Sequence, residues 1–213
     1  MNSNYEGFIK LLDLEDKDKS VNYALELLKS KKVTLEELYL DFLAPALTTF
    51  VCQEKEKEIC IWKEHTRTSI IRTILECTYP FVIERRNEIK KLHKKVVILT
   101  PSEEYHEIGA IIVNHFFMLA GFESQYIGAN TPKNDILMAV KAYQPDFVAI
   151  SVTNYYNIVI TKQITDGIKK NYPNVKIIVG GQAFLQHGAI DQISHDYYMQ
   201  KASDVFMIAK EVK

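Results

Sequence analysis

The sequence predicts an α/β protein in which an N-terminal helical bundle is followed by a doubly wound parallel sheet. Two observations predict this order. Over residues 1–93, apolar side chains recur at helical spacing and no run has the character of a strand. After residue 93, short β-branched runs alternate with helical segments of ten or more residues, the pattern of parallel sheets. We therefore expect two domains, residues 1–93 and 94–213.

The N-terminal region shows start and stop signals for four or five helices. Thr34 and Glu37 form a capping box ahead of an apolar helix, and Pro45 should kink or break that helix. A further helix is expected over Glu56–Cys77, and Pro80 should open the next one in its first turn. Helices of this length with short connections favour an antiparallel bundle.

The C-terminal region reads as a flavodoxin-like sheet. The expected strands are Lys95–Thr100, Glu123–Ile127, Asp146–Ser151, Val175–Val179 and, more weakly, Asp196–Met199. The expected helices are Ile108–Ala120, Asn134–Tyr143, Ile158–Tyr172 and one beginning at Ala202. Strands that are apolar throughout fit a sheet covered on both faces.

Composition and charge exclude several classes of protein. The 213 residues are 47% hydrophobic and 25% charged, with a net charge of −1, which argues against a disordered chain and a general nucleic-acid binder. No apolar run could span a membrane, and the N-terminus lacks a signal-peptide pattern. The three cysteines form no C-x-x-C and are expected to be reduced thiols. We expect a cytoplasmic protein that binds neither membrane nor nucleic acid.

Three loops should form the functional site, because ligands of open parallel sheets bind at the carboxyl ends of the strands. They are Thr100–Gly109, Ser151–Asn157 and Gly180–Phe184. They contain no G-x-G-x-x-G and no P-loop motif. A phospho-acceptor Asp is replaced by Ser151, and the first loop carries two carboxylates where a flavodoxin would carry phosphate-binding hydroxyls.

The first loop places Glu104 two residues before His106. A carboxylate that bonds one imidazole nitrogen leaves the other for a metal. A single histidine does not hold a free metal ion, but it can be the axial ligand of a metal held by a macrocycle. Gly109 allows close approach of a bulky group, and Gly180-Gly181 leaves a slot without side chains.

At these residues the sequence resembles the cobalamin-binding domain of methionine synthase, corrinoid carrier proteins and cobalamin-dependent light-responsive repressors. The family pattern is D-x-H-x-x-G, then S-x-L, then G-G. This chain has Glu104-x-His106-x-x-Gly109, Ser151-x-Thr153 and Gly180-Gly181, in order and at the family's spacing. The departures are Glu104 for Asp and Thr153 for Leu. The resemblance covers about residues 94–210.

The resemblance implies base-off, His-on binding of cobalamin. His106 would replace the cofactor's benzimidazole as the lower ligand of cobalt. The displaced nucleotide tail would lie beside Ser151, Thr153 and the glycine pair, and Glu104 with Asn157 would form a polar relay behind the histidine.

The helical region also resembles the cap that family members place over the upper face of the corrin. Leu43-Ala-Pro45-Ala-Leu47 and Glu64-His65-x-x-x-Ser69 match its P-A-x and E-H-x-x-S patterns, which would direct Glu64 and His65 at the upper ligand. Light-responsive members carry a Trp ten residues before this Glu, where this chain has Glu54. Trp62, on an apolar helix face, is expected in the core. A carboxylate at this face favours methyl, hydroxo or aquo ligands over adenosyl.

The implied function is a cobalamin-binding protein that acts as a sensor or cofactor carrier and is not catalytic alone. The alternative is the methyl-carrying corrinoid subunit of a cobalamin-dependent methyltransferase system. A storage or delivery protein is a third reading. A methyltransferase or a regulator is the expected protein partner. No DNA-binding helix-turn-helix precedes the bundle, so any regulation would act through that partner.

Overall fold

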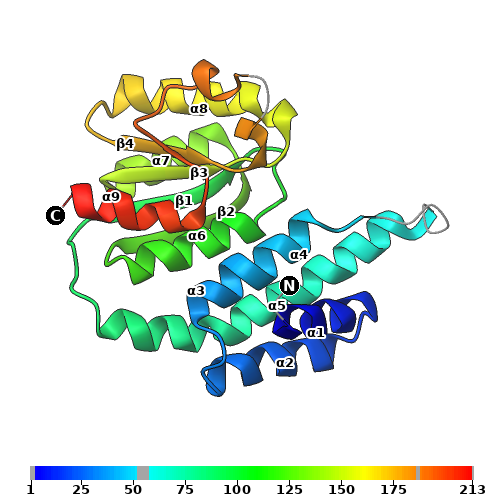
Figure 1. Ribbon diagram of the computed structural model, residues 1–213. Helices are drawn as coiled ribbons and strands as arrows, with labels where there is room; N and C mark the ends of the chain where they lie inside the picture. The colour runs from blue at the N-terminus through cyan, green and yellow to red at the C-terminus, as the bar shows by residue number, and fades with distance from the viewer. Residues whose placement is uncertain (1–2, 52–57, 186–187, 213) are drawn as a thin grey trace. The chain divides into compact units, whose positions relative to one another are not determined.

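The computed structural model describes residues 3–51, 58–185 and 188–212 (Figure 1). The chain divides into two compact units, Met1–Glu84 and Arg85–Lys213. The division falls inside a helix, earlier in the chain than the expected boundary after residue 93. Within the described ranges, no helix is both long enough and apolar enough to cross a membrane.

The first unit is helical. Asp16 caps α2 by accepting from the backbone N–H of Lys19 at 3.0 Å, and the predicted Thr34–Glu37 capping box is present. Its elements are α1 (Ser3–Asp13), α2 (Lys17–Lys29), α3 (Leu35–Glu37), the π-helix Leu38–Leu43, α4 (Ala44–Thr48) and most of α5 (Cys60–Asn87).

The two prolines of this unit behave differently. Pro45 lies at the start of α4, directly after the π-helical turn, so the expected distortion takes the form of a widened turn. The expectation that Pro80 opens a new helix is wrong, because Pro80 lies inside the 28-residue helix α5. Pro80 is exposed, between the buried Thr78 and Val82. Water can bond the carbonyl that the missing N–H leaves unpaired, while packing on the buried side holds the helix together.

Two further expectations for α5 are also corrected. Cys60 is disulfide-bonded, whereas Cys77 is a free, exposed thiol, so spacing alone did not establish that all three thiols are reduced. Trp62 is 58% exposed and therefore does not belong to the core. It lies on the same side of α5 as His65 and Ser69, which are exposed as well.

The second unit is a five-stranded parallel sheet of order β2-β1-β3-β4-β5. This is the flavodoxin-like order, and it confirms the predicted fold class. The strands are β1 (Lys95–Pro101), β2 (Glu123–Thr131), β3 (Phe147–Ser151), β4 (Lys176–Gly180) and β5 (Tyr197–Met199). The edge strand β2 extends to Thr131 rather than ending at Ile127.

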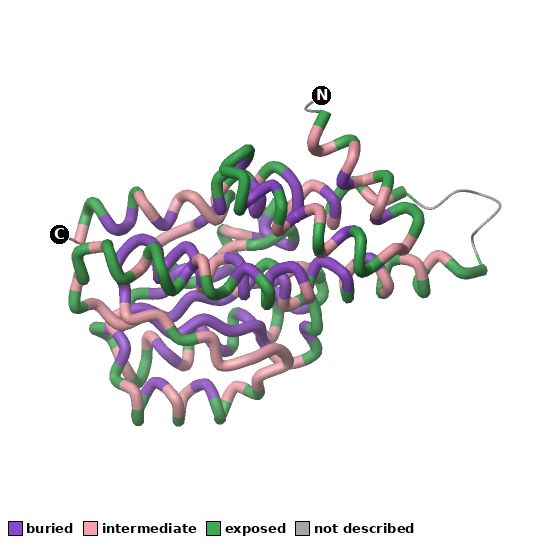
Figure 2. The backbone as a smooth tube through the Cα atoms, turned by 90° about the horizontal axis from the view of Figure 1, so that it is seen from below, coloured by how far each residue is buried: buried purple, intermediate pink, exposed green. Residues whose placement is uncertain are grey.

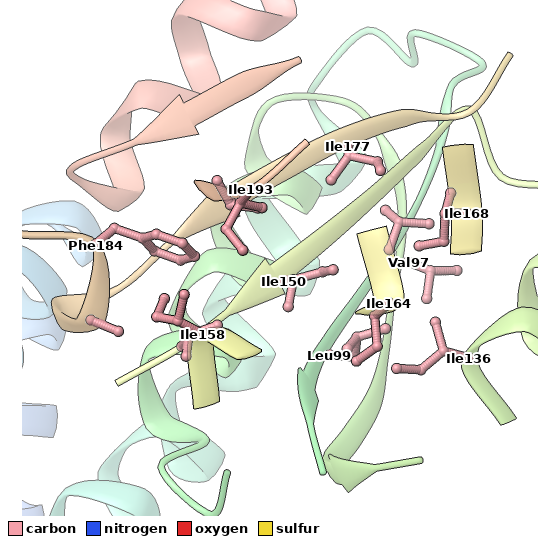
Figure 3. Packing of buried hydrophobic residues seen from close by; sticks show 14 of the residues in the cluster. Val97, Leu99, Ile136, Ile150, Ile158, Ile164, Ile168, Ile177, Phe184 and Ile193 are labelled. Carbon is pink, nitrogen blue, oxygen red and sulfur yellow. The ribbon is translucent and has the colours of Figure 1, made fainter. Parts of the chain in front are cut away.

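Helices cover both faces of the sheet, with α6 and α9 on one face and α7 and α8 on the other (Figure 1). Their bounds are Ile108–Leu119, Val205–Glu211, Lys133–Tyr143 and Ile158–Asn171, respectively. Buried backbone follows the strands through the middle of this unit (Figure 2). Figure 3 shows the core under α7 and α8, where Ile136 and Ile164 meet Leu99 and Ile150. The two-sided burial explains why β1, β3 and β4 are apolar along most of their length. The edge strand β2 is more polar, and none of its residues is fully buried.

Candidate cofactor-binding site

The loop between β1 and α6 begins with a tight turn. The N–H of Glu104 donates to the carbonyl of Pro101 at 3.1 Å, and Glu103, at the third position of the turn, has φ +64°. A positive φ at that position suits glycine, so a glutamate there needs support from its surroundings. The turn brings the side chain of Glu104 beneath the loop, where it is 0% exposed.

Glu104 is the centre of the site. One carboxylate oxygen accepts from the backbone N–H groups of Thr153 and Asn154 at 2.9 and 2.8 Å and from Asn157 Nδ2 at 3.1 Å. The other oxygen contacts His106 Nδ1 at 2.6 Å and its backbone N–H at 3.2 Å. Burial alone would raise the pKa of this carboxyl, but the hydrogen bonds outweigh burial and lower the pKa of Glu104 to about 2. The buried group is therefore an anion at neutral pH.

The ionised carboxylate can only accept hydrogen bonds. Nδ1 of His106 is therefore the protonated, donating nitrogen of the ring, and ligation of a metal falls to Nε2. The His106 side chain is 57% exposed although its partner is fully buried. The loop thus presents an imidazole of fixed tautomer at the ligand-binding end of the sheet.

The loop after β3 supplies most of the remaining contacts to Glu104. Asn157 is buried at the end of the 3-10 helix Tyr155–Asn157, and its amide also donates to the carbonyl of Glu103 at 3.3 Å. The predicted grouping of Glu104, His106 and Asn157 is therefore present in the structure. Thr153 contributes its backbone N–H to this group rather than its hydroxyl.

The glycines of the motif have two different environments. A Cβ on Gly181, whose φ is +110°, would lie 2.2 Å from the carbonyl oxygen of Val152, and one on Gly180 would lie 2.8 Å from that of Met199. Close packing of the strand ends therefore requires both glycines. This packing role is separate from the predicted slot for the nucleotide tail. A Cβ on Gly109 would meet only Ser151 Oγ within 4 Å among the described residues, at 3.7 Å. A small group beside Ser151 would therefore meet no close contact at Gly109.

The fold and this site together define a flavodoxin-like α/β protein whose exposed histidine is held by a buried carboxylate. A sequence profile described as "B12 binding domain" matches residues 94–208, which is more than half of the chain. The chain therefore belongs to the B12-binding domain family, and cobalamin is its cofactor. The predicted resemblance is confirmed.

The relatives found by sequence are corrinoid proteins. The trimethylamine corrinoid protein 1 of Methanosarcina acetivorans is 31% identical over 137 residues, covering 63% of this chain and 62% of the relative. The trimethylamine corrinoid protein of Methanosarcina barkeri is 32% identical over 127 residues, covering 59% and 58%. The chain spans about three fifths of the length of these curated relatives.

Two solved structures share the fold. The monomethylamine corrinoid protein of Methanosarcina barkeri superposes with a TM-score of 0.80 at 15% identity, over 99% of both chains. The methanol:cobalamin methyltransferase complex MtaBC of the same organism gives a TM-score of 0.52 at 18% identity, over 99% of this chain and 80% of that one.

Glu64 and His65 lie in the helical unit, both exposed on α5, and their role toward the upper ligand stays a prediction. Glu54 lies outside the described residues. The predicted site residues do not include Asn130, whose Oδ1 accepts from the backbone N–H of Glu103. Thr100 is predicted only as the first residue of the loop, and the structure shows that its hydroxyl donates to the carbonyl of Glu104. The Asn-Thr-Pro stretch after the expected second strand, Asn130–Pro132, is the signal that could have indicated a turn close to the site.

Proposed function

We propose that this chain is the methyl-carrying corrinoid subunit of a cobalamin-dependent methyltransferase system and binds its cofactor with His106 as the lower ligand. The observation that carries the proposal is the 2.6 Å contact between His106 Nδ1 and the buried carboxylate of Glu104. The methylamine corrinoid relatives favour this reading over a sensor. They also make methylated amines the first methyl donors to test.

The residues present fit cobalamin. His106 would supply one axial nitrogen, and Ser151, close to Gly109, would border the nucleotide tail. Bound cobalamin supplies the chemistry, because its cobalt can take a methyl group from one molecule and pass it to another. Glu104 keeps the His106 ring oriented with Nδ1 protonated, and the Asn157 amide keeps Glu104 in place.

The lower ligand is tested by electron paramagnetic resonance of cob(II)alamin bound to uniformly ¹⁵N-labelled protein. A ¹⁵N ligand from the protein splits each cobalt line into a doublet, whereas the ¹⁴N of the cofactor's own base gives a triplet. We expect doublets for the wild type and their loss in His106→Ala. Triplets in the wild type would show that the benzimidazole remains bound and would refute His-on binding.

The carrier role needs a separate assay. Reduced holoprotein is mixed with ¹³C-methyl-labelled trimethylamine and a clarified extract of its own organism, and the label on the protein-bound cofactor is measured. Transfer is expected for the wild type and not without the extract, because the chain is not catalytic alone. If dimethylamine, monomethylamine and methanol also give no label, the carrier proposal is contradicted, and the sensor and storage readings remain.

We further propose that the helical unit covers the upper face of the corrin, with Glu64 and His65 beside the upper ligand. The exposed side of α5 that carries Trp62, His65 and Ser69 is the surface that supports this role. Methyl- and hydroxocobalamin should then bind at least as tightly as adenosylcobalamin in dark titrations. The double substitution of Glu64 and His65 by Ala should change that preference, whereas Glu76→Ala, an exposed control on the same helix, should not.

The proposal includes a cytoplasmic location. Fractionation of the source cells, followed by immunoblotting, tests it, and recovery of the protein outside the cytoplasmic fraction would contradict it.

A further inference from the structure

The edge strand β2 reaches over the loop that carries His106. Register shifts interrupt its pairing with β1, so that Leu99 pairs with Gly128 but Pro101 pairs with Thr131. The extra residues form a bulge, and Asn130 at its end has φ +50°. Asparagine tolerates this left-handed conformation better than most residues. The bulge therefore turns Asn130 out of the regular pairing and toward the β1–α6 loop.

Asn130 makes a closed set of hydrogen bonds with this loop. Its Oδ1 accepts from the backbone N–H of Glu103 at 2.8 Å. Its own N–H donates to the carbonyl of Glu104 at 3.0 Å and to Thr100 Oγ1 at 3.1 Å. The Thr100 hydroxyl, which is fully buried, donates to the same Glu104 carbonyl at 2.6 Å. We call these four residues the Asn130 cluster.

The Asn130 cluster includes Glu103, whose backbone conformation is unfavourable for a residue with a side chain. Glu103 has φ +64°, a conformation that a non-glycine residue keeps only where its surroundings enforce it. The bond from its N–H to Asn130 Oδ1 supplies such a constraint. The next residue is Glu104, whose carboxylate orients His106. A change at Asn130 is therefore transmitted to the imidazole through two consecutive residues.

We infer that Asn130 is a positioning residue for the His106 ligand. It fixes the Glu103–Glu104 backbone so that the carboxylate of Glu104 meets the ring, although Asn130 itself contacts neither group in the hydrogen bonds described. The inference rests on the proposed lower-ligand function of His106. It adds to that function a residue on the far side of the loop, on a strand that carries none of the motif.

Two substitutions separate the parts played by Asn130. Asn130→Gly removes the Oδ1 acceptor but keeps a residue at ease with positive φ, whereas Asn130→Asp keeps an acceptor at the same place. Thr131→Val is the matched control, because it removes the Oγ1 bond to Gly128 at the same strand end and leaves the cluster intact. Glu103→Gly removes the strain of the positive φ at position 103, because glycine adopts that conformation readily.

The first readout needs no cofactor. Amide hydrogen exchange of Glu103 in the cofactor-free protein should accelerate about tenfold in Asn130→Gly, as expected for the loss of one hydrogen bond. It should stay near the wild-type rate in Asn130→Asp and in Thr131→Val. Unchanged exchange in Asn130→Gly would show that the side-chain bond does not hold the turn, and would overturn the inference.

The second readout is the ¹⁵N doublet of bound cob(II)alamin. We expect a several-fold smaller His-bound fraction in Asn130→Gly, partial recovery on adding Glu103→Gly, and wild-type spectra for Thr131→Val. Faster exchange with an undiminished doublet would limit Asn130 to loop stability and overturn the positioning role. If the wild type shows no doublet, lower-ligand function itself fails, and the exchange measurement still decides whether the cluster holds the turn.

Discussion

Each compact unit buries one charged side chain that can be compared with the other: Glu104 in the sheet unit and Arg67 in the helical unit. Glu104 receives hydrogen bonds from backbone and side-chain groups of two loops. Arg67 pairs with Asp13, donates to the carbonyl of Ala46 at 3.5 Å and lies over the Phe50 ring at 4.9 Å.

The two arrangements differ in which partner reaches solvent. Asp13, the partner of Arg67, is 59% exposed and is a carboxylate that water can solvate. His106, the partner of Glu104, is 57% exposed and is a potential metal ligand. A buried charge beside a hydrated ion fits a structural role, whereas a buried charge that fixes the tautomer of an exposed imidazole fits a functional one.

The largest expected effect is that of Glu104→Gln on the lower ligand. Two backbone N–H groups and the Asn157 amide donate to one carboxylate oxygen of Glu104, and in the variant they require the amide oxygen of Gln. The NH₂ group of Gln must therefore face His106 Nδ1. Nδ1 then becomes an acceptor, Nε2 carries the proton, and ligation of cobalt is blocked. We expect loss of the ¹⁵N doublet together with about 2 kcal/mol of destabilisation from weakened charge-assisted bonds. A full doublet in this variant would refute the tautomer argument.

Acid should remove the stabilisation that Glu104 provides. Its pKa falls from 4.5 to about 2 on folding, so the stabilisation is complete above pH 4.5 and is lost as the pH falls toward 2, at about 3 kcal/mol in total. Urea unfolding followed by circular dichroism between pH 7 and 2 measures it. Glu104→Gln should lack this part of the profile.

A second acid-sensitive group in the sheet unit gives a reference within the same profile. Burial lowers the pKa of His115, which is 5% exposed, from 6.5 to about 4. The unfolded chain therefore binds this proton at a higher pH than the folded one, so stability falls as the pH drops from 6.5 toward 4. This loss should be the same in the wild type and in Glu104→Gln. If Glu104→Gln changed the pH dependence of stability as much between pH 6.5 and 4 as between pH 4.5 and 2, the loss in the lower range could not be assigned to Glu104.

Arg67→Met should have a smaller effect, confined to the helical unit. It removes the buried charge, keeps an apolar side chain of similar length, and leaves Asp13 to the solvent. We expect about 1–2 kcal/mol of destabilisation, less than for a pair whose remaining charge stays buried. Urea unfolding followed by the fluorescence of Trp62, the single tryptophan, measures it. A loss of the His106 doublet in this variant would show that Arg67 is not merely structural.

The sheet unit was more predictable from sequence than the helical unit, for a physical reason. Parallel strands end at the same side of a sheet, so a correct strand order brings Glu104, His106 and Asn157 together without knowledge of any side-chain contact. No such rule places a helical residue, and Pro80 was misread because packing on the buried side of α5 outweighs the proline penalty. Asn130 was missed because its position depends on a bulge, which alternating patterns do not reveal.

The smallest stability effect is expected for Gly109→Ala, where stability and binding should change in opposite directions. Gly109 is the second residue of α6, has no positive φ, and is exposed. Alanine there should raise the free energy of unfolding by up to about 1 kcal/mol, because glycine is the poorer helix former.

The same methyl group would project into the space beside Ser151, with Ser151 Oγ at 3.7 Å. Affinity for cobalamin should therefore fall, while cobinamide, which lacks the nucleotide tail, should lose less. Parallel urea unfolding and dark titrations with both corrinoids measure the two effects. If alanine stabilises the protein and leaves cobalamin affinity unchanged, the nucleotide tail does not pass Gly109.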